Sequence, residues 1–181
     1  NPLITFYEGG ESGGLHVIGC GNATCTSVTR DRNLIASGRY GRQTSVAIGA
    51  DDKPIVSYAN STDGALYVGV CDITCMLFTP VSSLGAVVKQ TPSTPYGYRG
   101  TQIAIDTDDK PVVVFTDSGG NVGIAECDAW DCSTGATIST ITDSGRGGSV
   151  SLAIRDSDNA RIITYIDDAP GQLKIAVLSA P

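Results

Sequence analysis

Cysteine is the residue type with the clearest chemical potential here, because the six cysteines fall into three close pairs. Thiols four or five positions apart can close a disulfide across a hairpin or supply thiolate ligands to zinc. A tetrahedral zinc site needs its ligands in one place, whereas these pairs lie far apart along a chain with a single His. The spacing therefore favours one disulfide within each pair: Cys20–Cys25, Cys71–Cys75 and Cys127–Cys132.

Carboxylates recur in three short polar segments, at residues 51–54, 106–111 and 156–159. Calcium takes about six to eight oxygen ligands, so alternating carboxylates could bind it, and Asp106 with Asp108 is the best candidate pair. Asp and Asn also favour turns without any metal, because their side chains bond to the nearby backbone. Both interpretations stay open, and calcium is the only cofactor that the sequence suggests.

Arginine and aromatic residues form a third candidate group. Arg42, Arg99 and Arg146 recur through the chain, and Tyr98 adjoins the second of them. Guanidinium groups suit carboxylate or sulfate ligands, but they serve equally well in structural salt bridges. Trp130 lies between Cys127 and Cys132, where its ring could stack on a sugar, bind a protein partner or pack on its own disulfide.

The compartment and the partner class follow from composition. Paired cysteines suit an oxidising compartment, and two N-x-S/T sequons at Asn22 and Asn60 are glycosylation candidates. We therefore expect a secreted, extracellular or cell-surface protein, and we expect the chain to be a mature or excised piece because no signal peptide precedes the first strand-like segment. A formal net charge of −7 argues against nucleic acid, and no apolar run reaches the ~18–20 residues of a membrane span.

An internal repeat of about fifty residues positions all of these groups. An apolar run ending in an aromatic residue occurs four times, with Tyr7, Tyr58, Phe115 and Tyr165 at intervals of 51, 57 and 50 residues. Each is followed by a polar turn and a second apolar run, which ends at a Cys in the first three copies. A run rich in small residues precedes the last three copies, at residues 45–48, 102–105 and 151–154.

Each full unit thus contains four short strands, A to D, with no helical periodicity. Four strands per repeat of this length predict an all-β fold, a β-propeller of four-stranded antiparallel blades. We place the four repeats at residues 1–38, 39–95, 96–143 and 144–181, in one propeller domain or segment. The first repeat lacks strand A and the last lacks strand D.

The pattern resembles bacterial secreted propeller repeats that read S-x-A-x-D-x-x-G-x-P-x-I-S-Y-x-D followed by G-x-L-x-V-A-x-C. Residues 45–58 with 66–71, and 102–115 with 122–127, carry the resemblance. It implies an architecture and no particular activity. Asp52 and Asp109 stand where that pattern has a turn Gly, and Leu178 stands at the Cys position of the fourth copy.

Antiparallel connectivity sorts the candidates onto two faces. The A–B and C–D loops of one face hold the Cys pairs, the Asp-rich turns and Trp130. The other face holds the arginines with Glu8, Glu11, Asp63, Asp117, Asp167 and Asp168. Arginine, acidic residues and Tyr on one propeller face are the residue types that a sialidase uses. The Asp-box pattern is absent, however, and no acid–base pair stands out. We therefore predict no catalytic residue.

Two functional hypotheses follow. The first is a non-catalytic extracellular propeller for protein or glycan binding or for structural assembly. The alternative is a sialidase-like carbohydrate-active enzyme that uses the Arg-rich face. The incomplete end blades are compatible with a closed four-bladed ring and with a larger ring. They predict that residues 3–7 and 173–178 contact another chain or flanking sequence.

Overall fold

The computed structural model describes residues 1–9, 13–36, 40–49, 51–60, 64–72, 75, 77–84, 100–117, 119–142, 147–167 and 171–181. Every regular element in these ranges is a β-strand, as the repeat pattern predicted. The same ranges contain no helix that is long and apolar enough to cross a membrane.

The described strands form four antiparallel sheets, which we call blades 1 to 4. Blade 1 contains β1 (Leu3–Tyr7), β2 (Leu15–Cys20) and β3 (Val28–Ile35). Blade 2 contains β4 (Tyr40–Ile48), β5 (Pro54–Asn60), β6 (Leu66–Cys71) and β7 (Phe78–Ser83). Blade 3 contains β8 (Thr101–Ile105), β9 (Pro111–Thr116), β10 (Val122–Cys127) and β11 (Ala136–Thr142). Blade 4 contains β12 (Gly147–Arg155), β13 (Ala160–Asp167) and β14 (Gln172–Leu178).

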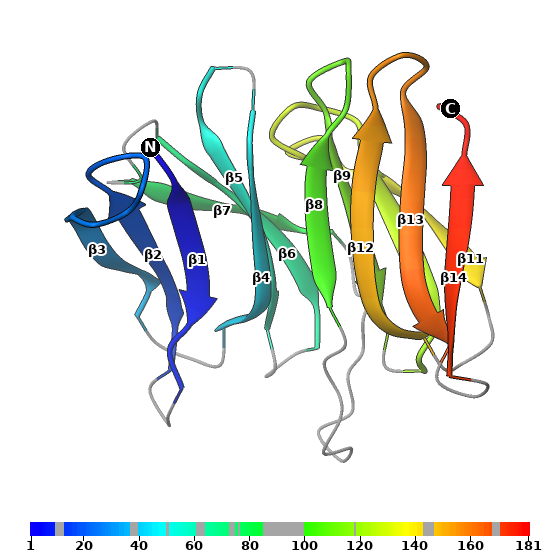
Figure 1. The fold of residues 1–181 in the computed structure, drawn as a ribbon, viewed down its shortest axis with the longest axis horizontal. Coiled ribbons are helices and arrows are strands. Elements are labelled where there is room, and N and C mark those ends of the chain that lie inside the picture. Colours follow the sequence, from blue (N-terminus) through cyan, green and yellow to red (C-terminus); the bar gives the residue numbers. More distant parts are fainter. Residues whose placement is uncertain are drawn as a thin grey trace.

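The blades stand side by side in chain order, as in a propeller (Figure 1). The first strands of successive blades contact one another: β1 with β4, β4 with β8, and β8 with β12. Blade 1 begins with strand B of the repeat and blade 4 ends with strand C, so the predicted loss of one strand at each end is confirmed. Figure 1 places blade 1 and β14 at opposite ends of the row.

The A–B turns share one backbone conformation. Asp52, Asp109 and Asn159 occupy the same position in three successive blades, with φ of 57°, 59° and 56°. This left-handed conformation is the one a Gly adopts without strain, and Asp and Asn are the other residues that tolerate it best. The replacement of the turn Gly at two of these positions therefore leaves the turn intact.

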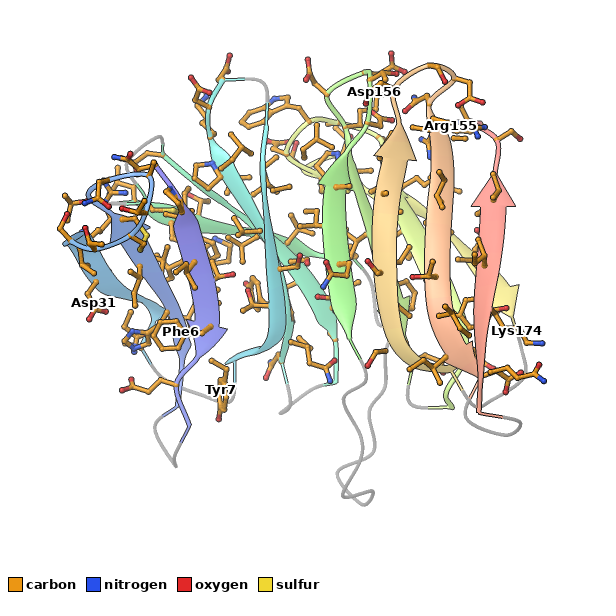
Figure 2. All side chains as sticks on the ribbon, viewed as in Figure 1. Phe6, Tyr7, Asp31, Arg155, Asp156 and Lys174 are labelled. Atoms are coloured by element: carbon orange, nitrogen blue, oxygen red, sulfur yellow. A yellow bond between two sulfur atoms is a disulfide. The ribbon has the colours of Figure 1, made fainter. Side chains whose placement is uncertain are left out.

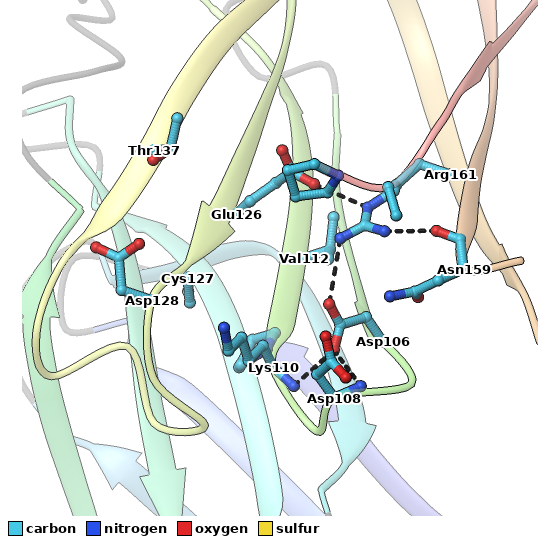
Figure 3. A pocket seen from close by; sticks show the side chains of 13 residues that line it. Asp106, Asp108, Lys110, Val112, Glu126, Cys127, Asp128, Thr137, Asn159 and Arg161 are labelled. Atoms are coloured by element: carbon cyan, nitrogen blue, oxygen red, sulfur yellow. Dashed lines mark hydrogen bonds and ion pairs between the residues drawn. The ribbon is translucent and has the colours of Figure 1, made fainter.

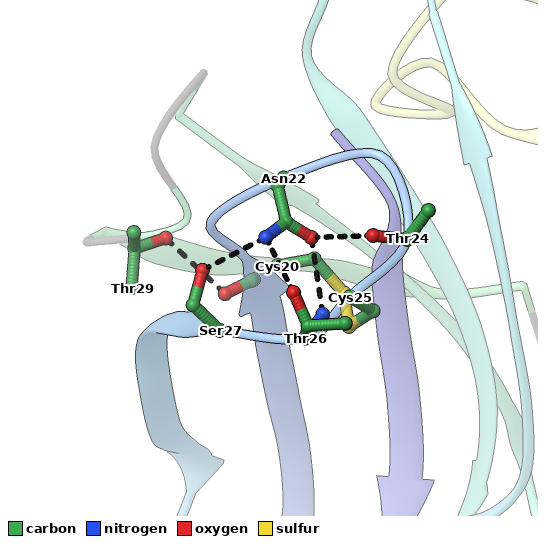
Figure 4. The surroundings of a disulfide bond; sticks show 8 residues. Cys20, Asn22, Thr24, Cys25, Thr26, Ser27 and Thr29 are labelled. Carbon is green, nitrogen blue, oxygen red and sulfur yellow. Dashed lines mark hydrogen bonds between the residues drawn. A yellow bond between two sulfur atoms is a disulfide. The ribbon is translucent and has the colours of Figure 1, made fainter.

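All three predicted disulfides are formed within the C–D connections, with Cα–Cα distances of 4.8, 4.6 and 4.9 Å. The second cysteine of each pair, Cys25, Cys75 or Cys132, also has positive φ. In the first of these turns, Asn22 Oδ1 accepts hydrogen bonds from Thr26 N at 3.0 Å and Thr24 Oγ1 at 3.2 Å (Figure 4). Each of these short loops is thus closed covalently, and the first is also closed by side-chain hydrogen bonds.

The core lies between the blades, because alternate residues of each central strand point toward one neighbouring blade. We call the side of a blade that packs on the following blade its forward face, and the opposite side its backward face. The third strand of the repeat supplies these buried forward-face residues: Leu15 and Val17, then Leu66, Val68 and Val70, then Val122 and Ile124. The residues that they meet on the backward faces include Val56 with Tyr58, Val113 with Phe115, and Ile163 with Tyr165.

The strand register corrects one part of the repeat alignment. Tyr58, Phe115 and Tyr165 pair with Tyr67, Gly123 and Lys174, each of which is the second residue of the next apolar run. In blade 1 the corresponding residue, His16, pairs with Phe6 and not with Tyr7. Phe6 therefore occupies the recurring aromatic position, because the hairpin of blade 1 pairs one residue out of step with the alignment.

Candidate functional site

The predicted arginine-rich face falls largely outside the described residues. Arg99, Arg146 and Tyr98 lie outside them, and only the backbone of Arg42 is described, in β4. Among the acids of that face, Asp117 accepts hydrogen bonds from Asn121 N at 2.7 Å and Asn121 Nδ2 at 2.8 Å. Asp117 thus serves its own turn, and ligand binding by the arginines stays a prediction.

The opposite face contains a polar cavity between blades 3 and 4, of about 270 Å³ (Figure 3). We call it the Arg161 pocket after the side chain at its base. Its polar lining comes from the A–B turns of both blades and from the end of β10. The residues concerned are Asp106, Asp108, Lys110, Glu126, Asp128, Thr137, Asn159 and Arg161.

Arg161 is the most enclosed charged residue of the pocket, with a side chain only 2% exposed. Its Nη2 lies 3.2 Å from Asp106 Oδ2, its Nε lies 2.8 Å from Glu126 Oε1, and its Nη1 donates to the Asn159 carbonyl (Figure 3). The Nε contact is an ion pair without the direction of a hydrogen bond, so the buried Nε–H has no hydrogen-bond acceptor within the described part of the chain.

Asp106 links the pocket to the turn that carries it. Its Oδ1 accepts the backbone N–H groups of Asp108 and Lys110, each at 2.9 Å, while Oδ2 faces Arg161. Both carboxylate oxygens therefore have protein partners. No three His, Cys, Asp or Glu side chains within the described ranges gather so as to hold a metal ion. The calcium site at Asp106 and Asp108 stays a prediction, and the structure supplies the turn chemistry that was its alternative.

Two of the three charged residues at the base of the pocket depart from the repeat. Arg161 pairs with Ile154 in the strand register, and the equivalent positions in blades 2 and 3 are prolines, Pro54 and Pro111. Glu126 precedes the Cys at the end of its strand, where blade 2 has Val70. Asp106 keeps the Asp of the repeat pattern S-x-A-x-D, which blade 2 replaces with Gly49. A position-by-position comparison of the repeats would have revealed the changes at Arg161 and Glu126 together.

Trp130 lies on the C–D turn that also supplies Asp128 to the pocket. Its side chain is exposed, and Lys53 Nζ from the A–B turn of blade 2 lies 4.9 Å from the ring centroid. The contact is a cation–π interaction between neighbouring blades. Trp130 therefore stands at the surface beside the pocket, with one face of its ring near a lysine.

The two sequons differ in their surroundings. Asn22 lies in the disulfide-closed turn of blade 1, where its Nδ2 donates to Thr26 Oγ1 at 2.8 Å. Asn60 is buried at the end of β5. Glycosylation at both residues stays a prediction, and of the two only Asn22 is even partly exposed.

Comparisons with known proteins identify the fold. No family model and no curated protein matches the chain. A GH43 β-1,3-galactosidase matches with a TM-score of 0.56 and 13% identity over 96% of this chain and 42% of its own. An exo-β-1,3-galactanase from Phanerochaete chrysosporium, with galactose, matches with a TM-score of 0.55 and 12% identity over 91% of this chain and 39% of its own. A further GH43 β-1,3-galactosidase, with galactodeoxynojirimycin, matches with a TM-score of 0.55 and 13% identity over 92% of this chain and 68% of its own.

These likenesses show that the chain has the β-propeller fold found in GH43 glycoside hydrolases. The chain spans less than half the length of the first two enzymes. At 12–13% identity these likenesses concern the fold alone. Three disulfides are compatible with an extracellular protein.

Proposed function

We propose that this chain is an extracellular, carbohydrate-active propeller that binds a sugar unit in the Arg161 pocket. The observation that carries the proposal is the buried Arg161 with its two carboxylate partners, where Arg161 and Glu126 take positions that blade 2 fills with Pro54 and Val70. Burying such a group between blades opposes folding unless every partner is satisfied, so its presence in one interface favours a functional reason.

A sugar suits this pocket because its hydroxyl groups both donate and accept hydrogen bonds. Asp108 and Asp128 are exposed carboxylates that can accept from hydroxyls, and the partly exposed Lys110 of the same lining can donate to a hydroxyl oxygen. The exposed ring of Trp130 on the adjoining turn offers a stacking surface for a neighbouring sugar unit.

The charge balance of the pocket favours a neutral sugar. Asp106 and Glu126 already pair with Arg161, and the two negative charges of Asp108 and Asp128 outnumber the single positive charge of Lys110. An anionic sugar would therefore meet repulsion without a free guanidinium to offset it. This argues for a hexose such as galactose, the sugar of the structural neighbours, and against the sialidase-like form of the hypothesis.

Hydrolysis of the bound glycan is a second candidate function. Glycoside hydrolases commonly use two carboxyl groups on either side of the scissile bond, one as general acid and the other as base or nucleophile. Glu126 is partly exposed in the pocket, and Asp108 and Asp128 lie in the same lining. Glu126, which is ion-paired with Arg161, is the residue that we propose as the base or nucleophile, with one of the two aspartates as the acid opposite it.

Isothermal titration with β-1,3-galactan oligosaccharides and with sialyllactose tests the proposal. We expect the galactan to bind and Glu126→Gln to weaken its binding about tenfold or more, since a charge-assisted hydrogen bond contributes about 1.5–3 kcal/mol. Asp156→Asn, on the exposed turn of blade 4, is the matched control and should bind like the wild type. Absence of galactan binding, or equal effects of the two variants, would contradict the proposal. Release of reducing sugar by wild type but not by E126Q would establish hydrolysis.

A further inference from the structure

The forward face of blade 4 is apolar and exposed. Leu173 and Ile175 of β14 are 70% and 65% exposed, and Val177 continues the same alternation along the strand. Ile166 of the neighbouring β13 is also exposed and pairs with Leu173. Successive alternate residues of a strand share one face, so these side chains form a single patch at the end of the molecule.

The positions of Leu173 and Ile175 are buried in every other blade. The register places Ile175 opposite Thr164, just as Val17 lies opposite Thr5, Val68 opposite Ser57 and Ile124 opposite Val114. All three of those counterparts are buried, because the following blade covers them. The exposed patch is therefore the fourth copy of an interface that the chain already forms three times.

The backward face of blade 1 shows the complementary situation. Ile4 pairs with Ile18 as Val56 pairs with Gly69 and Val113 with Ala125. Val56 and Val113 are fully buried against the preceding blade, as is Ile163 in blade 4, whereas Ile4 is 45% exposed. Phe6 stands at the recurring aromatic position of the same face (Figure 2).

We propose that the forward face of blade 4 docks onto the backward face of blade 1 of a second copy of this chain. Each of the three contacts between successive blades joins a forward face to a backward face. The exposed forward face of blade 4 and the exposed backward face of blade 1 are therefore complementary in kind. Phe6 of blade 1 and Lys174 of β14 lie at opposite ends of the molecule in Figure 2, so the two faces of one copy are too far apart to meet. The contact between copies is thus head-to-tail and leaves one free face at each end of a dimer.

A head-to-tail contact predicts how single-face variants behave. Ile175→Glu destroys the forward patch and keeps the backward face, whereas Ile4→Glu does the reverse. Leu77→Glu, at an exposed apolar residue outside both faces, is the control. Melting curves verify that each variant remains folded.

Sedimentation equilibrium from about 1 to 200 μM gives the readout, since standard interfaces have micromolar or tighter affinity. We expect the wild type and L77E to exceed the chain mass of 18.6 kDa, and I175E and I4E each to remain at that mass. An equimolar mixture of I175E and I4E should form a one-to-one dimer and nothing larger, because only one intact pair of faces remains. A wild type that stays monomeric at every concentration, or a mixture that does not associate, would overturn the proposal, and neither result bears on sugar binding.

Discussion

The interface between blades 2 and 3 and the interface between blades 3 and 4 are made by the same strands of the repeat, yet they bury different chemistry. Between blades 2 and 3, Val70 lies in a continuous apolar cluster with Val113 and Cys132. Between blades 3 and 4, the position of Val70 is taken by Glu126, which faces Arg161. The apolar cluster of this second interface continues beside the charged group, with Val112 and Ile163 among its members.

The hydrogen bonds of the two interfaces also lie at opposite ends of the strands. Thr101 bonds to the Gln43 carbonyl at 2.6 Å and to Ser57 Oγ at 3.2 Å, which joins blades 2 and 3 near the start of β8. Blades 3 and 4 are joined at the opposite end, where Thr107 N donates to Asn159 Oδ1 at 3.2 Å. The polar contacts between blades 3 and 4 within the described residues thus lie on the face that carries the pocket.

The comparison teaches that blade packing does not need the charged group. An apolar interface of the same geometry already holds blades 2 and 3 together, and a buried ion pair is weak support for stability because desolvation opposes its Coulombic attraction. The charged interface is therefore better explained by what it binds than by what it stabilises.

The largest effect is expected from Arg161→Met. Removal of the guanidinium leaves Asp106 and Glu126 between the blades without a counter-charge, which costs about 3–5 kcal/mol in the free energy of unfolding. Urea denaturation followed by circular dichroism measures it. A loss below about 1 kcal/mol would show that water reaches these carboxylates and that the two interfaces differ less than the structure indicates.

A triple variant that copies the apolar interface sharpens the comparison. Asp106→Gly, Glu126→Val and Arg161→Pro together install the residues found at Gly49, Val70 and Pro111. Replacement of a whole buried ionic group by apolar residues is often neutral or stabilising. We therefore expect the free energy of unfolding of the triple variant to lie within about 1 kcal/mol of the wild-type value. Galactan binding should be lost. A triple variant as unstable as R161M would mean that the charged group stabilises this interface.

The next effect concerns the apolar interface and its disulfide. Cys127→Ser with Cys132→Ser opens a loop whose closure contributes about 2 kcal/mol by chain entropy, and it also disturbs the core between blades 2 and 3. Cys20→Ser with Cys25→Ser removes a similar loop from blade 1, which has no preceding blade to pack on. We expect the double variant at Cys127 and Cys132 to lower the melting temperature more than the double variant at Cys20 and Cys25. Equal shifts would show that packing of the disulfide between the blades contributes nothing.

A smaller effect is expected where Lys53 of blade 2 lies over Trp130 of blade 3. A double-mutant cycle with Lys53→Met and Trp130→Leu should give a coupling energy of about 0.5–1 kcal/mol. Additive single effects would show that the two side chains do not interact in solution. In galactan titrations, W130L alone tests whether the ring also contacts the sugar.

The smallest effect is at the turn between β12 and β13, which borders the pocket. A hydrogen bond from Arg155, with Nε to Oδ1 at 2.7 Å, lowers the pKa of Asp158 from its usual 3.8. The pair therefore supports the turn above that pH, and its contribution disappears as the pH falls through the lowered pKa. Arg155→Ala should return the pKa of Asp158 toward 3.8 in an NMR titration, while Lys174→Ala, on β14, should leave it unchanged.

Much of the site could have been found by a closer comparison of the repeats. Glu126 and Arg161 break the pattern in two separate ways, but each change looks ordinary when it is considered alone. Asp106 reads as a turn residue, which it also is. The charges become a site only because consecutive blades bring residues 55 positions apart within 3.2 Å.

The sequence by itself determined the strand count of each blade, the three disulfides and the all-β class. These features depend on contacts within a hairpin, where alternation, turn residues and Cys spacing act over a few positions. Only the structure showed that Phe6 and not Tyr7 takes the aromatic position, because the repeat alignment does not reveal the register in which β1 pairs with β2. Tertiary structure alone decided that Arg161 faces Glu126 and that Leu173 and Ile175 stay exposed, because those outcomes follow from the stacking of one sheet on the next.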